Sequence, residues 1–136
     1  MKSIYAVFDT NVLVSSLMSK RSDSPTTLLL DYVLNGCIVL LYNEEILEEY
    51  SDVLHRSKFS FSEERIHAVM EMVSTGLSID RLPSEEVFPD ADDQVFYEVA
   101  LSKEGSYLVT GNQKHFPQSP IVVTPAEMLQ IVQSNK

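Results

Sequence analysis

The residues of this chain that could do chemistry are carboxylates placed after an apolar run or on helices. The first, Asp9, ends the run Ile4–Phe8 and is followed by Thr10 and Asn11. Five apolar residues are too few for a helix but suit a strand buried on both faces. Ligands of open α/β folds bind beyond the carboxyl ends of parallel strands, so Asp9 is placed to hold a cation or to react. Alternatively, Asp9 or Thr10 caps the helix predicted from Val12.

A second group of acids lies on the segment 43–56, which is predicted to be a helix capped by Asn43. A helical wheel puts Glu49 about 100° and Glu44 about 120° from the centre of the apolar stripe, with the other three acids further away. Glu49 is therefore the best candidate to reach inward toward Asp9, by a small margin over Glu44. The alternative is that all five acids form a solvated face.

A third group of acids, Asp90, Asp92 and Asp93, opens the next predicted helix. Acids in a first helical turn interact favourably with the helix dipole, and Asp90 with Asp93 has the spacing of a capping box. These effects explain one or two of the three acids without any function. The wheel does not choose between Asp92 and Asp93 as the acid that points inward.

Convergence of Asp9, Glu49 and one acid of the third group at the strand ends would require a cation. Carboxylates about 4 Å apart repel by roughly 4 kcal/mol per pair at an effective dielectric constant near 20. Such a group persists only if acids take up protons or a hard cation binds, and all-oxygen ligands favour Mg²⁺ or Mn²⁺ over zinc. Metal-assisted hydrolysis of a phosphodiester is the chemistry that this predicts.

Other catalytic patterns do not occur in the sequence. It has no Gly-rich phosphate loop, no G-x-S-x-G elbow, one cysteine (Cys37, predicted to be a small buried side chain) and no histidine pair at metal-binding spacing. A phosphatase with Asp9 as nucleophile would need a second acid two residues later, where this chain has Asn11. A receiver domain would need an acid pair there and a lysine after a late strand, so both classes rank low.

Composition limits how the chain can meet a nucleic acid. Its net charge of −10 excludes a general binder with a basic surface, so any contact needs a local basic patch or a metal ion. No apolar stretch approaches the length of a membrane span, and the apolar run before Asp9 is too short for a signal peptide; we expect a cytoplasmic protein. Candidate phosphate contacts are Lys20, Arg21, Arg56, Lys58 and Lys114.

Short apolar strands alternate with amphipathic helices along the chain. This pattern predicts a single domain over residues 1–136, a three-layer α/β/α sandwich on a mostly parallel four- or five-stranded sheet. The predicted strands are 4–8, 37–41, 107–110 and 121–123, with 77–82 as a short edge strand. The predicted helices are 12–18, 25–34, 43–56, 62–75, 90–104 and 125–132.

Four motifs, in order, resemble those of PIN domains. They are Phe8–Ser15, Glu44–Leu54, Asp90–Ala100 and Tyr107–Phe116, and the match runs in register over residues 4–124. The resemblance implies an α/β/α fold and a Mg²⁺- or Mn²⁺-dependent endoribonuclease acting on RNA. Many small bacterial members are toxins of toxin–antitoxin modules (VapC-like), commonly dimeric and silenced by a small antitoxin protein.

The resemblance also assigns roles to single residues. Asn11 and Thr110 would orient the acids by hydrogen bonds. The fourth motif usually carries Asp where this chain has Asn112, which would position water or metal with one charge fewer. A catalytically weak or silent PIN-fold binding module is therefore the alternative to an active enzyme. The implied metal ligands, or members of their outer shell, are Asp9, Glu49 and Asp93.

Overall fold

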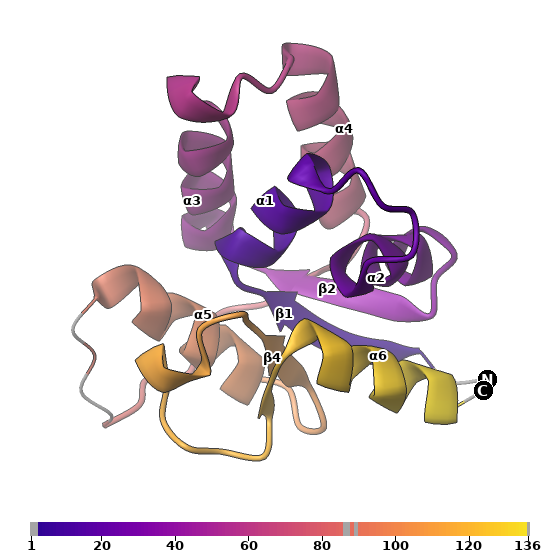
Figure 1. Cartoon of the computed structure of the whole chain (residues 1–136). Helices are drawn as coiled ribbons and strands as arrows, with labels where there is room; N and C mark the ends of the chain where they lie inside the picture. Colours follow the sequence, from indigo (N-terminus) through magenta and orange to yellow (C-terminus); the bar gives the residue numbers. More distant parts are fainter. Residues whose placement is uncertain (1–2, 86–87, 89, 136) are drawn as a thin grey trace.

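The computed structural model describes residues 3–85, 88 and 90–135, which build a twisted parallel sheet (Figure 1). Its order is β3-β2-β1-β4-β5, and every neighbouring pair is parallel. The strands are β1 (Ile4–Phe8), β2 (Ile38–Tyr42), β3 (Leu77–Ser78), β4 (Tyr107–Val109) and β5 (Val122–Val123). The central strand β1 is flanked by β2 and β4, so the sheet grows outward from the segment that ends at Asp9.

Helices cover both faces of this sheet. They are α1 (Thr10–Met18), α2 (Pro25–Leu34), α3 (Glu44–Leu54), α4 (Glu63–Ser74), α5 (Ala91–Leu101) and α6 (Pro125–Ser134). The crossovers through α1–α2 and α3–α4 step from β1 to β2 to β3, whereas the crossover through α5 runs back to β4. Right-handed crossovers place α5 on the face opposite α1–α4, as Figure 1 shows. The predicted three-layer α/β/α sandwich is confirmed.

Local capping chemistry explains where the helices begin. Ser24, Asn43 and Ser62 each accept a hydrogen bond from a backbone N–H in the first turn of the following helix, at 3.4, 2.8 and 3.2 Å. Thr124 and Glu127 form a reciprocal capping box at the start of α6. These helix starts were all predictable because each cap is a short polar residue just before an apolar stripe.

Some predicted boundaries were wrong. The edge strand expected over 77–82 is only Leu77–Ser78, because the Leu82 N–H donates to the Glu98 carbonyl of α5 at 3.3 Å and not to a neighbouring strand. Helix α1 begins two residues earlier than expected, at Thr10. Cys37 is half-buried and packs at the margin of the core.

The core lies between the sheet and the helices. Its largest fully buried side chains include Tyr50, Phe8 and Phe96, which come from α3, β1 and α5. These three elements carry Glu49, Asp9 and Asp93, so one core supports the three predicted acids. Within residues 3–85, 88 and 90–135, no helix has the length and apolar character that a membrane crossing needs.

Candidate active site

The candidate site lies where the order of the sheet reverses. From β1 the chain passes to β2 on one side, while β4 occupies the other side. In doubly wound sheets this reversal opens a crevice at the carboxyl ends of the two strands, where ligands bind. The register pairs Phe8 with Val109, so the next residue on each strand, Asp9 and Thr110, must lie side by side.

A hydrogen bond joins these two residues. The Thr110 hydroxyl donates to Asp9 Oδ2 at 2.7 Å, and the Asp9 backbone N–H donates to the Val109 carbonyl at 2.9 Å. Thr110 is fully buried and Asp9 is 8% exposed. The hydroxyl therefore fixes the carboxylate at the strand end, and the orienting role predicted for Thr110 has direct geometric support.

The residues after the two strands extend this network. The Asn11 side-chain amide donates to Asp9 Oδ2 at 3.3 Å, while its oxygen accepts from the Gly111 N–H at 3.4 Å. The Asn112 N–H donates to the Thr110 hydroxyl at 3.0 Å. Asn112 itself is exposed and begins the short 3₁₀-helix η2 (Gln113–His115). The structure thus brings four of the six predicted site residues into one hydrogen-bonded group.

Asp9 occupies the N-cap position of α1 without acting as its cap. Its side chain makes no capping hydrogen bond to the backbone N–H groups two or three residues further on, which a capping side chain normally binds. Burial raises the pKa of the Asp9 carboxyl above its ordinary value, although hydrogen bonds from Thr110 and the Thr10 N–H and the charge of His115 act in the opposite direction. A buried acid that does not cap its helix and resists ionisation fits a binding or catalytic role better than a structural one.

Asp93 lies on the first turns of α5 and faces His115. Its carboxylate Oδ2 is 3.8 Å from His115 Nδ1, and its side chain is 17% exposed. The charges of His115 and Asp90 both act on the pKa of Asp9, which places them near that carboxyl. The sequence did not point to His115, since it has no partner at metal-binding spacing; its position after the Thr110–Asn112 segment was the available signal.

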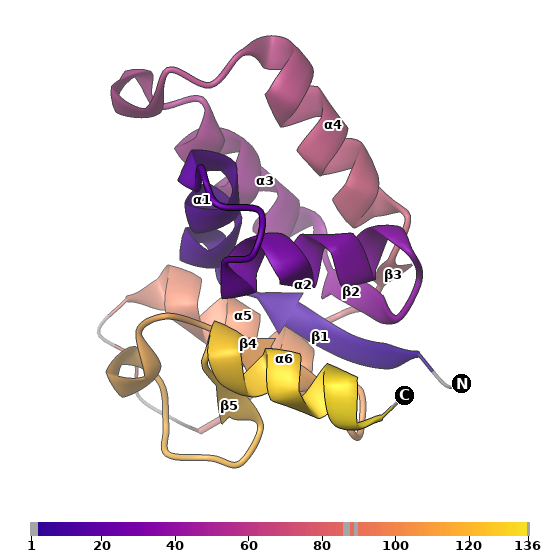
Figure 2. The same ribbon diagram turned by 45° about the vertical axis from the view of Figure 1, so that its right-hand side comes forward.

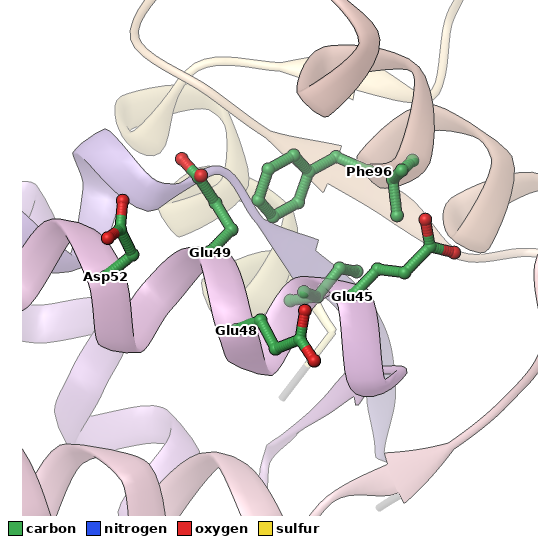
Figure 3. Close-up of a pocket in the computed structure, with 7 residues that line it drawn as sticks. Glu45, Glu48, Glu49, Asp52 and Phe96 are labelled. Carbon is green, nitrogen blue, oxygen red and sulfur yellow. The ribbon is translucent and has the colours of Figure 1, made fainter.

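Glu49 lies on the wall of an adjacent cleft. This cleft, about 280 Å³, is lined by Glu45, Ile46, Glu48, Glu49, Asp52, Val95 and Phe96. In Figure 3, Glu49 lies beside the Phe96 ring, and Asp52 extends to the same side of α3. Glu49 is half-buried whereas the other four acids of α3 are exposed, so the wheel identified the innermost acid correctly.

Tyr50 connects the elements that carry the acids, and sequence reasoning missed this role. Its hydroxyl donates to the Phe8 carbonyl at the end of β1, and its ring lies 5.9 Å from the Phe96 ring of α5. Burial raises the pKa of the Tyr50 hydroxyl well above its ordinary value, as does the nearby charge of Asp9. A tyrosine within an apolar helical stripe was the signal, because a buried hydroxyl needs an acceptor.

Comparison with known proteins identifies the family. The family model described as "PIN domain" matches residues 5–114, which is most of the chain and includes Asp9, Asn11, Glu49, Asp93, Thr110 and Asn112. The chain belongs to the PIN domain family. Among solved structures it resembles the crystal structure of PAE2754 from Pyrobaculum aerophilum, with 15% identity, a TM-score of 0.56, and coverage of 97% of this chain and 90% of that one. The search of curated proteins gave no match.

PIN domains are generally metal-dependent nucleases. The ligand atoms that this PIN domain offers are of the type that a divalent cation binds. The candidate ligands are carboxylate and amide oxygens, which hard divalent cations prefer. The hydroxyl of Thr10, directly after Asp9, is buried without a hydrogen-bond partner in the described part of the chain, as expected beside a site that takes up water or an ion. The predicted cluster of three converging carboxylates is not assembled: among the described residues, no three His, Cys, Asp or Glu side chains are gathered to hold a metal.

A buried acid that is not among the predicted metal ligands, Glu98, connects helices and a loop next to the cleft. Glu98 of α5 is 3% exposed and accepts hydrogen bonds from the Ser84 N–H at 2.7 Å and from Gln94 at 3.0 Å. Arg81 lies 3.4 Å from Glu98 and 3.3 Å from Glu45 of α3. Arg81 thereby links the helices that bear Asp93 and Glu49, and Glu98 fixes the segment that carries Arg81.

Glu98→Gln is expected to destabilise the protein at neutral pH by about 1–3 kcal/mol, because charged hydrogen bonds are lost. Burial raises the pKa of Glu98, but the hydrogen bonds from Gln94 and Ser84 and the Arg81 charge outweigh it, and the pKa lies below 4.5. A lowered folded pKa stabilises above pH 4.5, and this stabilisation is lost as the pH falls through the folded value. Urea unfolding should therefore show the variant and the native protein converging below pH 4.5, with exposed Glu104→Gln as control.

Proposed function

We propose that this protein is a Mg²⁺- or Mn²⁺-dependent endoribonuclease that hydrolyses RNA phosphodiesters. The observation that carries the proposal is the buried Asp9 carboxylate, held by Thr110 at the β1–β4 switch point of a PIN domain. Asp9, Glu49 and Asp93 would hold the metal directly or through water. The bound ion supplies Lewis acidity toward a phosphoryl oxygen and toward water, and offsets charge repulsion between RNA and this acidic chain.

The chain's own residues prepare the site for this reaction. Thr110 and Asn11 hold Asp9 Oδ2, which fixes the direction of the carboxylate. Tyr50 holds α3 against the end of β1 and so sets the distance between the backbones that carry Glu49 and Asp9. Asn112, exposed beside Thr110, would position water or the metal with its amide.

The test is cleavage of structured and single-stranded RNAs in Mn²⁺ or Mg²⁺, compared with EDTA. We expect cleavage with a divalent ion and none in EDTA, because the acids alone offer no Lewis acid to the phosphate. Cleavage that persists unchanged in EDTA would contradict the metal-dependent mechanism.

The toxin role is a further part of the proposal. A chain of 136 residues with a net charge of −10 suits the toxin of a toxin–antitoxin pair, cytoplasmic and dimeric, bound by a small basic antitoxin. A small open reading frame beside its gene should encode a protein that copurifies with this chain and inhibits its cleavage. Unchanged cleavage in the presence of that protein would contradict the pairing.

A silent PIN-fold binding module is the second candidate, and Asn112 favours it because an acid is usual at that position. Asn112→Asp discriminates between the two candidates. If the native protein cleaves, we expect the added carboxylate to strengthen Mn²⁺ binding and increase cleavage at limiting Mn²⁺, roughly 10-fold or more. If only the variant cleaves, the native protein is a decayed enzyme; if neither cleaves, the binding module is supported.

A further inference from the structure

The segment that joins α3 to α4, residues 55–62, differs in charge from the rest of this acidic chain. It contains His55, Arg56 and Lys58 but no Asp or Glu, whereas the whole chain has 20 acids and 10 Lys and Arg. Figures 1 and 2 place this α3–α4 connection at one end of the molecule, beyond the sheet. The composition of this segment is a local exception in a chain whose net charge of −10 repels nucleic acid.

Two aromatic rings stack in this connection. The Phe59 and Phe61 rings are nearly parallel, at 10°, with centroids 5.5 Å apart. Lys58 Nζ lies 5.1 Å from the Phe59 centroid, and the Arg65 guanidinium lies 5.3 Å from that of Phe61. Both rings are half-buried; Phe61 packs against the hydrophobic core. The pair therefore presents a supported aromatic surface next to cations.

The backbone between the rings adopts an unusual conformation. Ser60 has a φ of +54°, the one positive φ at a non-glycine residue in the described part of the chain. Residues other than glycine adopt this left-handed backbone conformation only at a cost in free energy, and such residues are often found at functional sites. Here the turn at Ser60 lets two residues separated by one position stack on each other.

A contact from α4 adds the end of α1 to this surface. The Arg65 guanidinium donates to the Leu17 carbonyl at 2.6 Å, which ties the end of α1 to the first turn of α4, next to the α3–α4 connection. Helix α1 begins directly after Asp9 and has nine residues, so its far end lies about 14 Å from the candidate site. A strand of a few nucleotides spans that distance.

We propose that the α3–α4 connection binds single-stranded RNA, with a base stacked on Phe59 and the backbone phosphates contacted by Lys58. The inference rests on the proposed function, since the RNA would be the substrate whose cleaved phosphate lies at Asp9. Aromatic faces beside cations are how proteins hold single strands without reading sequence. Among the described residues Lys58 makes no ion pair; its ammonium lies over the Phe59 ring and would turn from that ring to a phosphate when a base stacks there. Arg56, in contrast, lies 3.4 Å from Asp52.

The test measures binding without catalysis. The 136-residue chain is titrated in EDTA against a fluorescein-labelled uridine oligomer of about twelve nucleotides, and anisotropy gives Kd. Phe59→Ala should raise Kd about 5- to 100-fold, whereas Phe59→Trp, which keeps a stacking face, should not. Lys58→Ala should lower the slope of log K against log salt by about 0.7, the effect of one phosphate contact.

The matched control is Lys103→Ala. Lys103 also stacks on an aromatic ring, with Nζ 4.3 Å from the Tyr5 centroid, but it lies outside the α3–α4 connection. We expect this variant to bind like the native protein. Thermal unfolding of each variant separates loss of binding from loss of fold.

The assignment would be overturned if the native protein did not bind RNA, if Phe59→Ala bound with the native Kd, or if Lys58→Ala and Lys103→Ala lost affinity equally. A change of oligomeric state in Phe59→Ala at unchanged RNA affinity would mark a contact between protein copies and also overturn it. Binding that depends on Phe59 in a protein that never cleaves RNA would support this surface and refute the endoribonuclease. Cleavage with no dependence of binding on Phe59 would do the reverse.

Discussion

Asp9→Asn is expected to reduce metal-dependent RNA cleavage by more than about 100-fold while leaving the fold intact. Residues that only orient metal ligands already cost about 10- to 100-fold when removed, so loss of a ligand should cost more. Asparagine keeps the size of the side chain, and its amide oxygen can still accept the bonds that Asp9 Oδ2 receives from Thr110 and Asn11, at 2.7 and 3.3 Å. Single-turnover cleavage of a labelled RNA measures the effect.

The same substitution is expected to raise the stability of the metal-free protein at neutral pH. Burial raises the folded pKa of Asp9 above 3.8, and the hydrogen bonds from Thr110 and Thr10 offset this in part. A raised folded pKa means that stabilisation by Asp9 is fully present below pH 3.8 and is lost as the pH rises through the folded value. Above its folded pKa Asp9 is an ionised, buried carboxylate, which costs stability, and asparagine removes that cost.

Urea unfolding in EDTA tests this expectation. The stability difference between the variant and the native protein should shrink as the pH falls through the raised folded pKa of Asp9 toward the ordinary value of 3.8. Asp31→Asn, on the exposed face of α2, removes the same charge away from the site and should change neither cleavage nor this pH profile. If Asp9→Asn cleaved RNA at the rate of the native protein, Asp9 would not be a metal ligand. If the variant were less stable than the native protein, the pKa argument would be contradicted.

The sequence predicted that the site lies at the carboxyl ends of parallel strands, but not which residues contact each other there. Asp9 and Thr110 each end a short apolar run, and parallel strands bring their carboxyl ends to one edge. The contact between them was not predictable from spacing, because it depends on the pairing of Phe8 with Val109 across a separation of about a hundred residues. Glu49 was predictable because helix periodicity alone decides which acid borders the core.

Other parts of the site depend on tertiary contacts that no local pattern encodes. The apolar stripe predicted that Tyr50 would be buried, but only the fold shows that its hydroxyl meets the Phe8 carbonyl. His115 of η2 lies 3.8 Å from Asp93 on α5, a contact between segments that are far apart in the sequence. The edge strand expected over 77–82 was predicted too long, because the Leu82 N–H bonds with the Glu98 carbonyl of α5. The metal ion was predicted from the repulsion between converging carboxylates, and the residues that would bind it remain part of the proposal.

Gly76→Ala is expected to cause the largest loss of stability, about 3 kcal/mol or more. Gly76 follows α4 and packs against β2, where a Cβ atom would lie 2.0 Å from the Leu40 carbonyl oxygen and 2.9 Å from its carbon. Both partners are backbone, so relief requires α4 or β2 to move. Leu40 pairs with Ala6 of β1, so a shift of β2 would strain the central strand that ends at Asp9. Urea unfolding of the variant measures the loss.

Two other glycines separate steric overlap from backbone conformation. Gly111→Ala should be nearly neutral for stability, since its Cβ would meet only Asn11 Oδ1, at 3.8 Å, and its φ is not positive. Gly36 has a φ of +86° but open space around it, so Gly36→Ala should cost about 1–2 kcal/mol from conformation alone. If Gly36→Ala proves costlier than Gly76→Ala, backbone conformation outweighs the approach of α4 to β2. We expect the loss of stability to be largest for Gly76→Ala, smaller for Gly36→Ala and smallest for Gly111→Ala. This order follows only if the fold requires α4 to approach β2 closely at Gly76.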